Sequence, residues 1–163
     1  MQEPARIAID LGAESCRVSL LRWKDGRPEI EVVHRIPNGP VRRGLSLHWP
    51  LDAILAGLDE GLRKAADRSP EGIASIAVDG WSVDYVRLAP DGKALGEPFC
   101  YRDERTIPAK DAADAILSPR SIFERTGVLP HRINTVYQLL ADPKTILLPR
   151  HPGLCFPSIF STG

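Results

Sequence analysis

The feature that most constrains this chain is a pair of alternating apolar runs within residues 7–21, IAIDLGAESCRVSLL, joined by a short polar turn that contains a glycine. Branched apolar side chains recur at every second position before the turn and again after it, which is the period of paired β-strands. The turn is short enough to join the runs as a tight hairpin. A hairpin fixes the register of its two strands, so later strands are expected to pair with the edges of this hairpin.

The turn also carries residues that suit an anion and a metal ion. Gly12, the small residues Ala13 and Ser15, and the following Arg17 can bring backbone N–H groups, a hydroxyl and a positive charge close to a phosphate. Asp10 ends the first strand, and its carboxylate can face the same space and hold Mg2+. The hairpin therefore predicts a triphosphate cradle. The same residues are also ordinary turn formers, so a purely structural role stays open.

Two further patterns extend the hairpin into a sheet. An Asp-Gly turn at residues 25–26 leads to a third alternating run at residues 29–36, which predicts a second hairpin. The run at residues 73–79, IASIAVD, is typical of a strand buried on both faces. Between them, helical spacing predicts a helix that begins at Pro50, with an apolar face of Leu51, Ile54, Leu55, Leu58, Leu62 and Ala65.

A strand, a helix and a strand in this order imply a right-handed crossover, so residues 73–79 are expected to lie parallel to the first strand. Asp10 and Asp79 then stand at the carboxyl ends of neighbouring strands, the edge at which open α/β sheets bind ligands. We expect the two carboxylates to share one cleft. A solvent-facing cap at the strand end is the alternative role for Asp79.

Composition narrows the class of partner. The chain has 21 Lys and Arg residues and 21 Asp and Glu residues. It therefore has no net positive charge that would attract nucleic acid. This argues against a ribonuclease-H-like nuclease with two metal ions, the best rival enzyme for two adjacent acids. No apolar run approaches the about 18 residues of a membrane helix, so no membrane partner is expected. Three widely spaced cysteines match neither a disulfide framework nor a zinc site, and a cytoplasmic setting is expected.

The remaining segments have weaker patterns. Residues 37–46 are expected to form a loop, and residues 83–88 a strand followed by a turn at residues 90–92. Residues 99–106, FCYRDERT, are either a loop that recognises a polyhydroxylated ligand or a solvated charge cluster.

Helices are expected further along the chain. Helical composition predicts one at residues 109–117 and another turn or two at residues 134–140. Ser121 and Glu124 form a capping box, which predicts the start of a short helix. Gly127 is expected to end this helix.

Five collinear segments within residues 7–141 resemble the rhamnulokinases, a branch of the FGGY carbohydrate kinases. They are IAIDLGAESCRV, HWPLD, ASIAVDGWSVDYVRL, YRDERT and IFERTGVLPHRINTVYQL. The resemblance implies an α/β fold, the ribonuclease-H-like lobe shared with actin and hexokinase, with a mixed sheet and flanking helices. Trp81 favours this branch over xylulokinase and glycerol kinase, which resemble each other in carrying Gln there and which stay as alternatives.

The resemblance implies ATP-dependent phosphorylation of L-rhamnulose to L-rhamnulose 1-phosphate with Mg2+, in rhamnose catabolism. Asp10 would take the metal-linked carboxylate role, and Trp81 and Ser82 would border the sugar. The nucleotide phosphates would be lined by Ala13, Glu14, Ser15, Cys16 and Arg17. Cys16 and Ser82 stand where the family usually has glycine, and a Cβ at either place is expected to narrow the approach of phosphate or sugar.

The same resemblance sets the expected extent of the chain. Residues 1–143 are expected to be the N-terminal part of the first kinase lobe, and residues 144–163 a poorly matching, proline-rich tail. The general-base aspartate and the lobe that holds adenosine are expected beyond residue 163, in a missing C-terminal half that is a possible partner. We therefore expect the fragment alone to be inactive. A non-catalytic remnant or interaction module of the same fold is the alternative.

Overall fold

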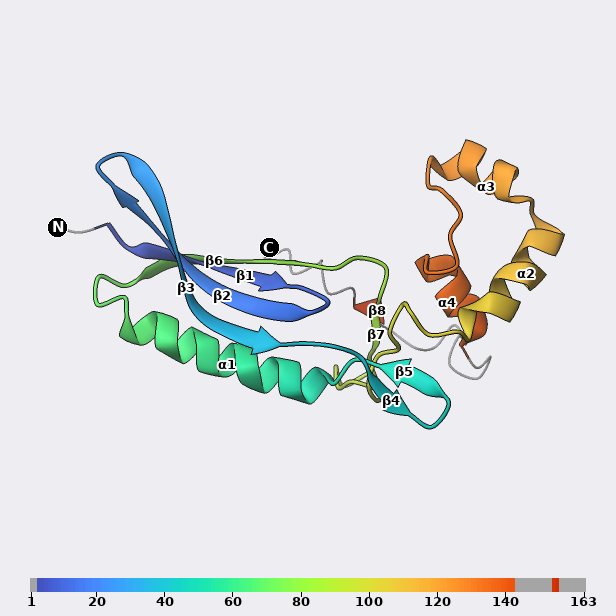
Figure 1. Ribbon diagram of the computed structural model, residues 1–163, viewed down its shortest axis with the longest axis horizontal. Coiled ribbons are helices and arrows are strands. Elements are labelled where there is room, and N and C mark those ends of the chain that lie inside the picture. Colours follow the sequence, from blue (N-terminus) through green and yellow to red (C-terminus); the bar gives the residue numbers. More distant parts are fainter. Residues whose placement is uncertain (1–2, 143–153, 156–163) are drawn as a thin grey trace. The chain divides into compact units, whose positions relative to one another are not determined.

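The computed structural model describes residues 3–142 and 154–155, and the chain divides into two compact units (Figure 1). Among the described residues, the first unit is built from residues 3–39 and Pro50–Ser82, and the second from Pro40–Trp49, residues 83–142 and residues 154–155. The expected domain boundary at residue 143 stays a prediction. The expected tail at residues 144–163 lies outside the described residues, apart from residues 154–155.

A four-stranded mixed sheet forms the body of the first unit, with strand order β3-β2-β1-β6. Its strands are β1 (Ala5–Leu11), β2 (Ser15–Lys24), β3 (Arg27–Pro37) and β6 (Ile73–Gly80). The pairs β1–β2 and β2–β3 are antiparallel, whereas β6 is parallel to β1. Both predicted hairpins and the predicted crossover are therefore confirmed.

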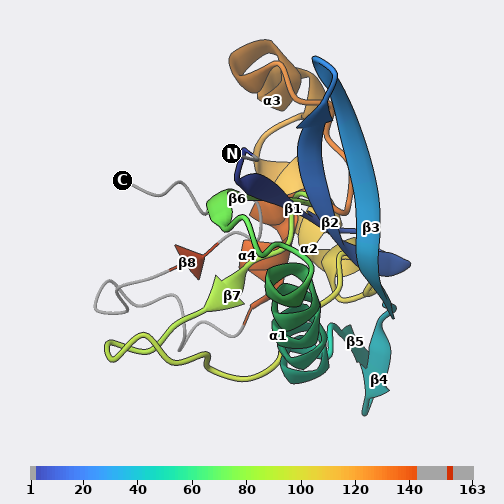
Figure 2. The same ribbon diagram turned by 90° about the vertical axis from the view of Figure 1, so that its left-hand side faces the viewer.

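The register places the large apolar residues of the hairpin on one face. Ile7 lies opposite Leu20 and Ile9 lies opposite Val18, and all four side chains are buried. Helix α1 (Leu51–Asp67) runs along the sheet and packs mainly on β2 and β3 (Figures 1 and 2). The alternation along residues 7–21 thus gives one face to the core of this unit and leaves the other to solvent.

Small residues bring α1 close to the sheet. Its buried residues are Ile54, Gly61 and Ala65, whereas Leu55, expected on the apolar face, is 51% exposed. The helix sits so close to β2 that a Cβ on Gly61 would lie 2.5 Å from Cγ2 of Val18. The predicted apolar face is therefore confirmed at the buried Ile54 and Ala65 and is wrong at Leu55, while Gly61 marks the closest approach of the helix to β2.

β6 differs from the expected strand buried on both faces. Residues Ala74, Ser75, Ile76 and Ala77 are exposed, and the exposed fraction of Ile76 is 53%. Within the described part of the chain, β6 ends the order of the sheet and has β1 as its only neighbouring strand. The apolar run correctly indicated a strand, but its burial depends on what covers it.

The second unit contains short strands and three helices. Strands β4 (Val41–Arg43) and β5 (Ser46–His48) form a two-stranded sheet where a loop was expected, and β7 (Val86–Arg87) pairs with β8 (Leu154–Cys155). β7 covers only part of the strand predicted at residues 83–88. Its helices are α2 (Thr106–Ile116), α3 (Pro119–Thr126) and α4 (Thr135–Ala141).

The start of α3 differs from expectation, whereas its end agrees with it. The cap of α3 is Ser118, whose hydroxyl accepts from the Ser121 N–H at 3.2 Å, and not the predicted box of Ser121 and Glu124. Pro119 at the first helical position makes the earlier start favourable. Gly127 ends α3 as predicted, with φ 69° and its N–H bonded to the Phe123 carbonyl.

A buried polar network holds the second unit together. The Asp84 carboxylate accepts from Trp49 Nε1 at 2.6 Å and from Gln138 Nε2 at 2.9 Å. Asp103 of the FCYRDERT segment is also buried and accepts from the backbone N–H of Leu47 at 2.6 Å. Buried carboxylates must be hydrogen-bonded, and Asp103 has such a bond. The segment therefore has a structural role within the second unit and is not a solvated charge cluster.

We expect Gly61→Ala to lower the free energy of unfolding by about 1 kcal/mol or more, although alanine is the better helix former. The added methyl group would meet Val18, which is fully buried. Gly57→Ala is the matched comparison, because its Cβ would lie 2.9 Å from the half-buried side chain of Ile36, a less close contact for which we expect a smaller loss. Urea unfolding measures both, and an equal effect would contradict the proposed close contact.

Candidate functional site

Four charged residues form one row across the sheet of the first unit. Asp10 lies opposite Arg17 on β2 and opposite Asp79 on β6, and Arg17 lies opposite Arg35 on β3. Val18, which follows Arg17, contacts α1 through Gly61, so the row projects from the opposite face. The predicted neighbourhood of the two carboxylates is therefore confirmed by the register.

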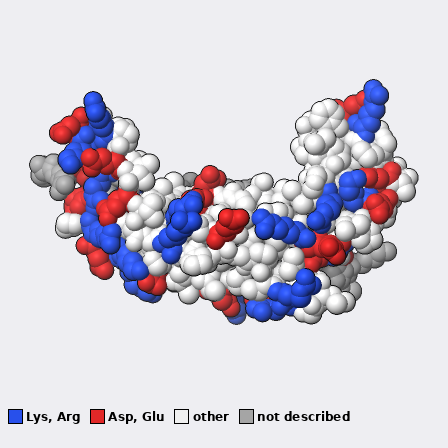
Figure 3. Space-filling model, viewed as in Figure 1, with Lys and Arg blue, Asp and Glu red and all other residues white. Residues whose placement is uncertain are grey.

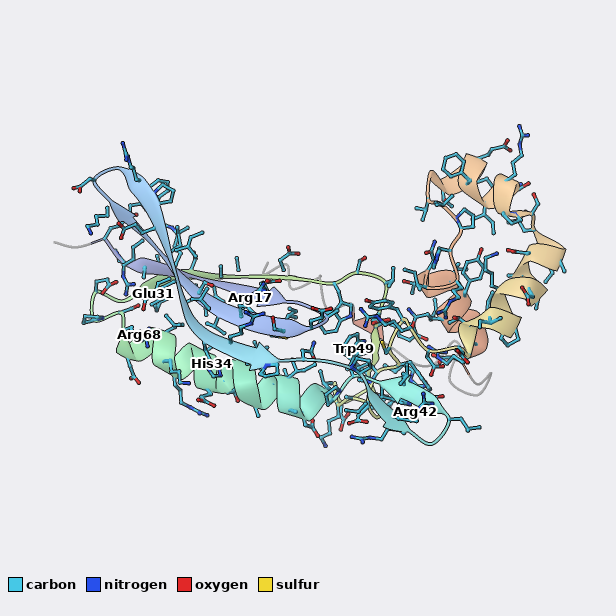
Figure 4. All side chains as sticks on the ribbon, viewed as in Figure 1. Arg17, Glu31, His34, Arg42, Trp49 and Arg68 are labelled. Carbon is cyan, nitrogen blue, oxygen red and sulfur yellow. The ribbon has the colours of Figure 1, made fainter. Side chains whose placement is uncertain are left out.

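Arg17 is bound to Asp10. Its Nη1 donates to Oδ2 of Asp10 at 2.6 Å, and Figure 4 shows Arg17 on the strands of the β1–β2 hairpin. The two side chains are 39% and 53% exposed, so solvent screens the pair and it contributes little stability. Such a carboxylate remains available to a cation, and such a guanidinium to an anion.

Asp79 caps the end of β6, which is the alternative role considered for it. Its Oδ1 accepts from the Gly80 N–H at 2.9 Å, which is a local cap at the end of β6. The residue is exposed and stands next to Asp10 in the row. The cap orients the carboxyl group, and it leaves the group on the same open face as Asp10.

The turn between β1 and β2 is closed too tightly for a side chain at Gly12. A Cβ there would lie 2.5 Å from the carbonyl oxygen of Ser15. Ala13 and Glu14 are half-buried and exposed, respectively, whereas Ser15 is buried and its hydroxyl accepts from Arg35 Nε at 3.2 Å. Of the residues of this turn, Glu14 is therefore the exposed one.

Cys16 differs from the other predicted phosphate residues. Its side chain is fully buried, with Sγ 3.9 Å from the Gly12 carbonyl, and burial raises the pKa of the thiol. The thiol therefore points away from solvent. Because the side chain is buried, it does not support the expectation that its Cβ narrows the approach of a phosphate. A phosphate could reach this residue through its backbone only.

Trp81 and Ser82 follow directly after β6. The Trp81 N–H donates to the Leu11 carbonyl at 3.1 Å, so the ladder between β1 and this segment continues past Gly80. Trp81 is half-buried and Ser82 is exposed. The structure thus brings the residues predicted to border a sugar next to the residue that precedes Gly12.

The next residue, Val83, belongs to the second unit and has an unusual backbone. Its φ of 74° lies in the left-handed region, which costs a β-branched residue about 1–3 kcal/mol. Its carbonyl accepts from Thr135 Oγ1 at 2.7 Å and from Gln138 Nε2 at 3.1 Å. Two residues of the NTVYQL segment therefore hold this conformation, a role that the sequence did not reveal.

Sequence reasoning also missed Asn38, which contacts the turn directly. Its Nδ2 donates to the Gly12 carbonyl at 2.8 Å, and its backbone N–H donates to the Glu14 carbonyl at 2.9 Å. The only local signal was an asparagine in a Pro-Asn-Gly stretch, which is typical of any loop. The contact follows from the register of β3 on β2, where Pro37 lies opposite Ser15.

The described residues form no large area of one charge on the face shown in Figure 3. Figure 3 shows Lys and Arg interleaved with Asp and Glu over the face in view. The described residues include no group of three or more His, Cys, Asp or Glu side chains that could hold a metal ion by themselves. None of the described helices is both long enough and apolar enough to cross a membrane.

Known proteins of similar sequence are rhamnulokinases. No protein-family model matches the chain. A rhamnulokinase of Yersinia pestis (strain Pestoides F) is 40% identical over 139 residues, which is 83% of this chain and 28% of that protein. A rhamnulokinase of Ligilactobacillus salivarius (strain UCC118) is 33% identical over 143 residues, 88% of this chain and 29% of that protein.

Solved structures support the same fold. The ligand-bound xylulose kinase of Lactobacillus acidophilus superposes with a TM-score of 0.71 at 16% identity, over 86% of this chain and 29% of that one. The predicted fold, a ribonuclease-H-like lobe with a mixed sheet and flanking helices, is confirmed. The chain spans less than a third of the length of these relatives.

The strained backbone at Val83 gives a testable prediction. Val83→Gly should reduce stability less than Val86→Gly, by about 1 kcal/mol or more, because glycine relieves the strain at φ 74°. Val86 is the matched control, since it is also half-buried and lies in strand β7. Denaturant unfolding compares them, and equal losses would show that the Val83 conformation stores no strain.

Proposed function

We propose that the hairpin of this chain, which belongs to the rhamnulokinase branch of the FGGY carbohydrate kinases, binds the phosphates of ATP. The chain matches less than a third of the length of these relatives. The reaction would be phosphorylation of L-rhamnulose at O1. The observation that carries the proposal is the row of Arg17, Asp10 and Asp79 beside a turn that is closed around Gly12.

The residues of the row fit a nucleotide with Mg2+. Asp10 offers an exposed carboxylate, and oxygen ligands of this kind suit a hard cation. Bound Mg2+ would neutralise charge on the phosphates. Asp79 adds a second negative charge on the adjacent strand, which would favour the cation at this end of the sheet.

Arg17 would change partners when the nucleotide binds. Without a ligand its guanidinium neutralises Asp10 at 2.6 Å. A cation at Asp10 would replace that neutralisation and leave Arg17 to pair with a phosphate oxygen, for which a guanidinium is well suited. Phosphoryl transfer depends mostly on positioning and charge neutralisation, which these side chains and the turn backbone would supply.

The sugar would lie near Trp81 and Ser82. The ladder bond from Trp81 to Leu11 sets this segment beside the end of β1, where Asp10 also lies. An indole offers an apolar face to the C–H groups of a sugar, and the exposed Ser82 offers a hydroxyl. The proposal assigns no general base to the described residues, and the remaining lobes are proposed to supply one.

We expect Asp10→Asn to lower turnover by orders of magnitude with little effect on folding, because the side chain is exposed and would act through the metal ion. The assay uses a chimera in which this chain replaces the matching part of the Yersinia pestis relative. Asp25→Asn is the matched control, since Asp25 is an exposed residue in the β2–β3 turn. Wild-type turnover in the Asp10 variant would rule out the metal role.

The 163-residue chain alone should show no useful sugar-dependent turnover. A general base contributes about 10²- to 10⁴-fold, and closure of two lobes around the substrates contributes further. The measurement is ADP release with ATP, Mg2+ and L-rhamnulose, with glycerol and D-xylulose as control sugars. Turnover of about 1 per second or faster would show that the chain holds its own base.

A further inference from the structure

We infer that Asn38 is a positioning residue that presets the hairpin turn for phosphate, an inference that rests on the proposed function. Asn38 lies just after β3 and bonds the turn at two points. Its Nδ2 donates to the Gly12 carbonyl at 2.8 Å, and its backbone N–H donates to the Glu14 carbonyl at 2.9 Å. One residue of a neighbouring strand thus fixes two carbonyl groups of the turn.

The orientation of the Asn38 amide follows from its partners. Its Oδ1 accepts from the Gly39 N–H at 2.9 Å, so the other amide atom must be the nitrogen that donates to Gly12. Pro37 lies opposite Ser15 in the ladder, and the next residue, Asn38, donates its backbone N–H to the Glu14 carbonyl. Asn38 is thus the first residue after β3, and both its side chain and its backbone are hydrogen-bonded to the turn.

The consequence for a ligand follows from the planarity of the peptide bond. No described peptide bond is cis, so the N–H of Ala13 points opposite to the Gly12 carbonyl, and the N–H of Ser15 opposite to the Glu14 carbonyl. Holding both carbonyls toward Asn38 turns both N–H groups the other way. Backbone N–H groups held in one direction form an anion-binding concavity without reorganisation on binding.

The neighbouring contacts limit how the turn can relax. The Gly12 carbonyl is also the acceptor nearest to Sγ of Cys16, at 3.9 Å, and Arg35 Nε donates to the Ser15 hydroxyl at 3.2 Å. These bonds hold Cys16 and Ser15, but neither sets the direction of the Gly12–Ala13 peptide as the 2.8 Å bond from Asn38 does. Asn38 is therefore the residue whose loss should free that peptide.

The test uses the full chain with Asn38→Ser and Asn38→Ala. A serine hydroxyl can still accept from the Gly39 N–H, but it is one bond too short to donate to Gly12. Both variants keep the net charge, so they do not alter the attraction for an anion. Asn134→Ala is the matched control, because Asn134 Nδ2 also donates to a backbone carbonyl, that of Leu129 at 3.0 Å, in the second unit.

Binding of MgATP and of magnesium tripolyphosphate is measured by calorimetry. We expect Kd for both to rise about three- to tenfold in the Asn38 variants, the factor expected for one net hydrogen bond, and to stay unchanged in Asn134→Ala. The tripolyphosphate probe removes any contribution of adenosine. A rise of less than about threefold in both variants would overturn the inference, since the preset turn would then contribute nothing.

A second measurement separates this inference from the proposed function. Amide NMR relaxation should show exchange on the microsecond to millisecond timescale at residues 12–15 in the Asn38 variants and not in the wild type. Failure of the wild type to bind either probe would contradict the proposed function of the chain. Unchanged relaxation at residues 12–15 would contradict the positioning role of Asn38, whatever the binding result.

Discussion

The antiparallel register of β1 on β2 is the constraint on which the first unit depends. It sets Ile9 against Val18 on the buried face and Asp10 against Arg17 on the open one. A slip of one residue would exchange the two faces and put a carboxylate into the core. The short turn around Gly12 opposes this slip, because the length and geometry of a hairpin turn fix the register of the strands that it joins. The fold and the candidate site therefore share one determinant.

Sequence periodicity was sufficient for the sheet because its signals are local or follow from chirality. The Asp-Gly turn and the alternation on either side predicted the β2–β3 hairpin, and the handedness of the crossover predicted β6 beside β1. Asp10 and Asp79 were brought together by this reasoning alone. Recognition of the family added roles for residues of the turn, which periodicity could not assign.

The remaining features depend on contacts that are not encoded in a local pattern. The closest approach of α1 depends on Gly57 and Gly61, which a hydrophobicity pattern reads as gaps in the apolar face. The bond of Asn38 to the turn depends on the register of a strand that begins elsewhere, and the Val83 conformation depends on side chains of α4. Each is a long-range consequence of packing, so sequence spacing could indicate a loop but not its partner.

The glycines of α1 also bear on the order in which the unit folds. Each interior glycine lowers intrinsic helix stability by about 1 kcal/mol, so α1 gains most of its stability from docking on β2 and β3. The two hairpins form by closing short loops. The pairing of β6 with β1 closes a much longer loop, which includes the whole of α1. Loop-closure entropy therefore favours formation of both hairpins before the β1–β6 pairing that brings Asp79 beside Asp10.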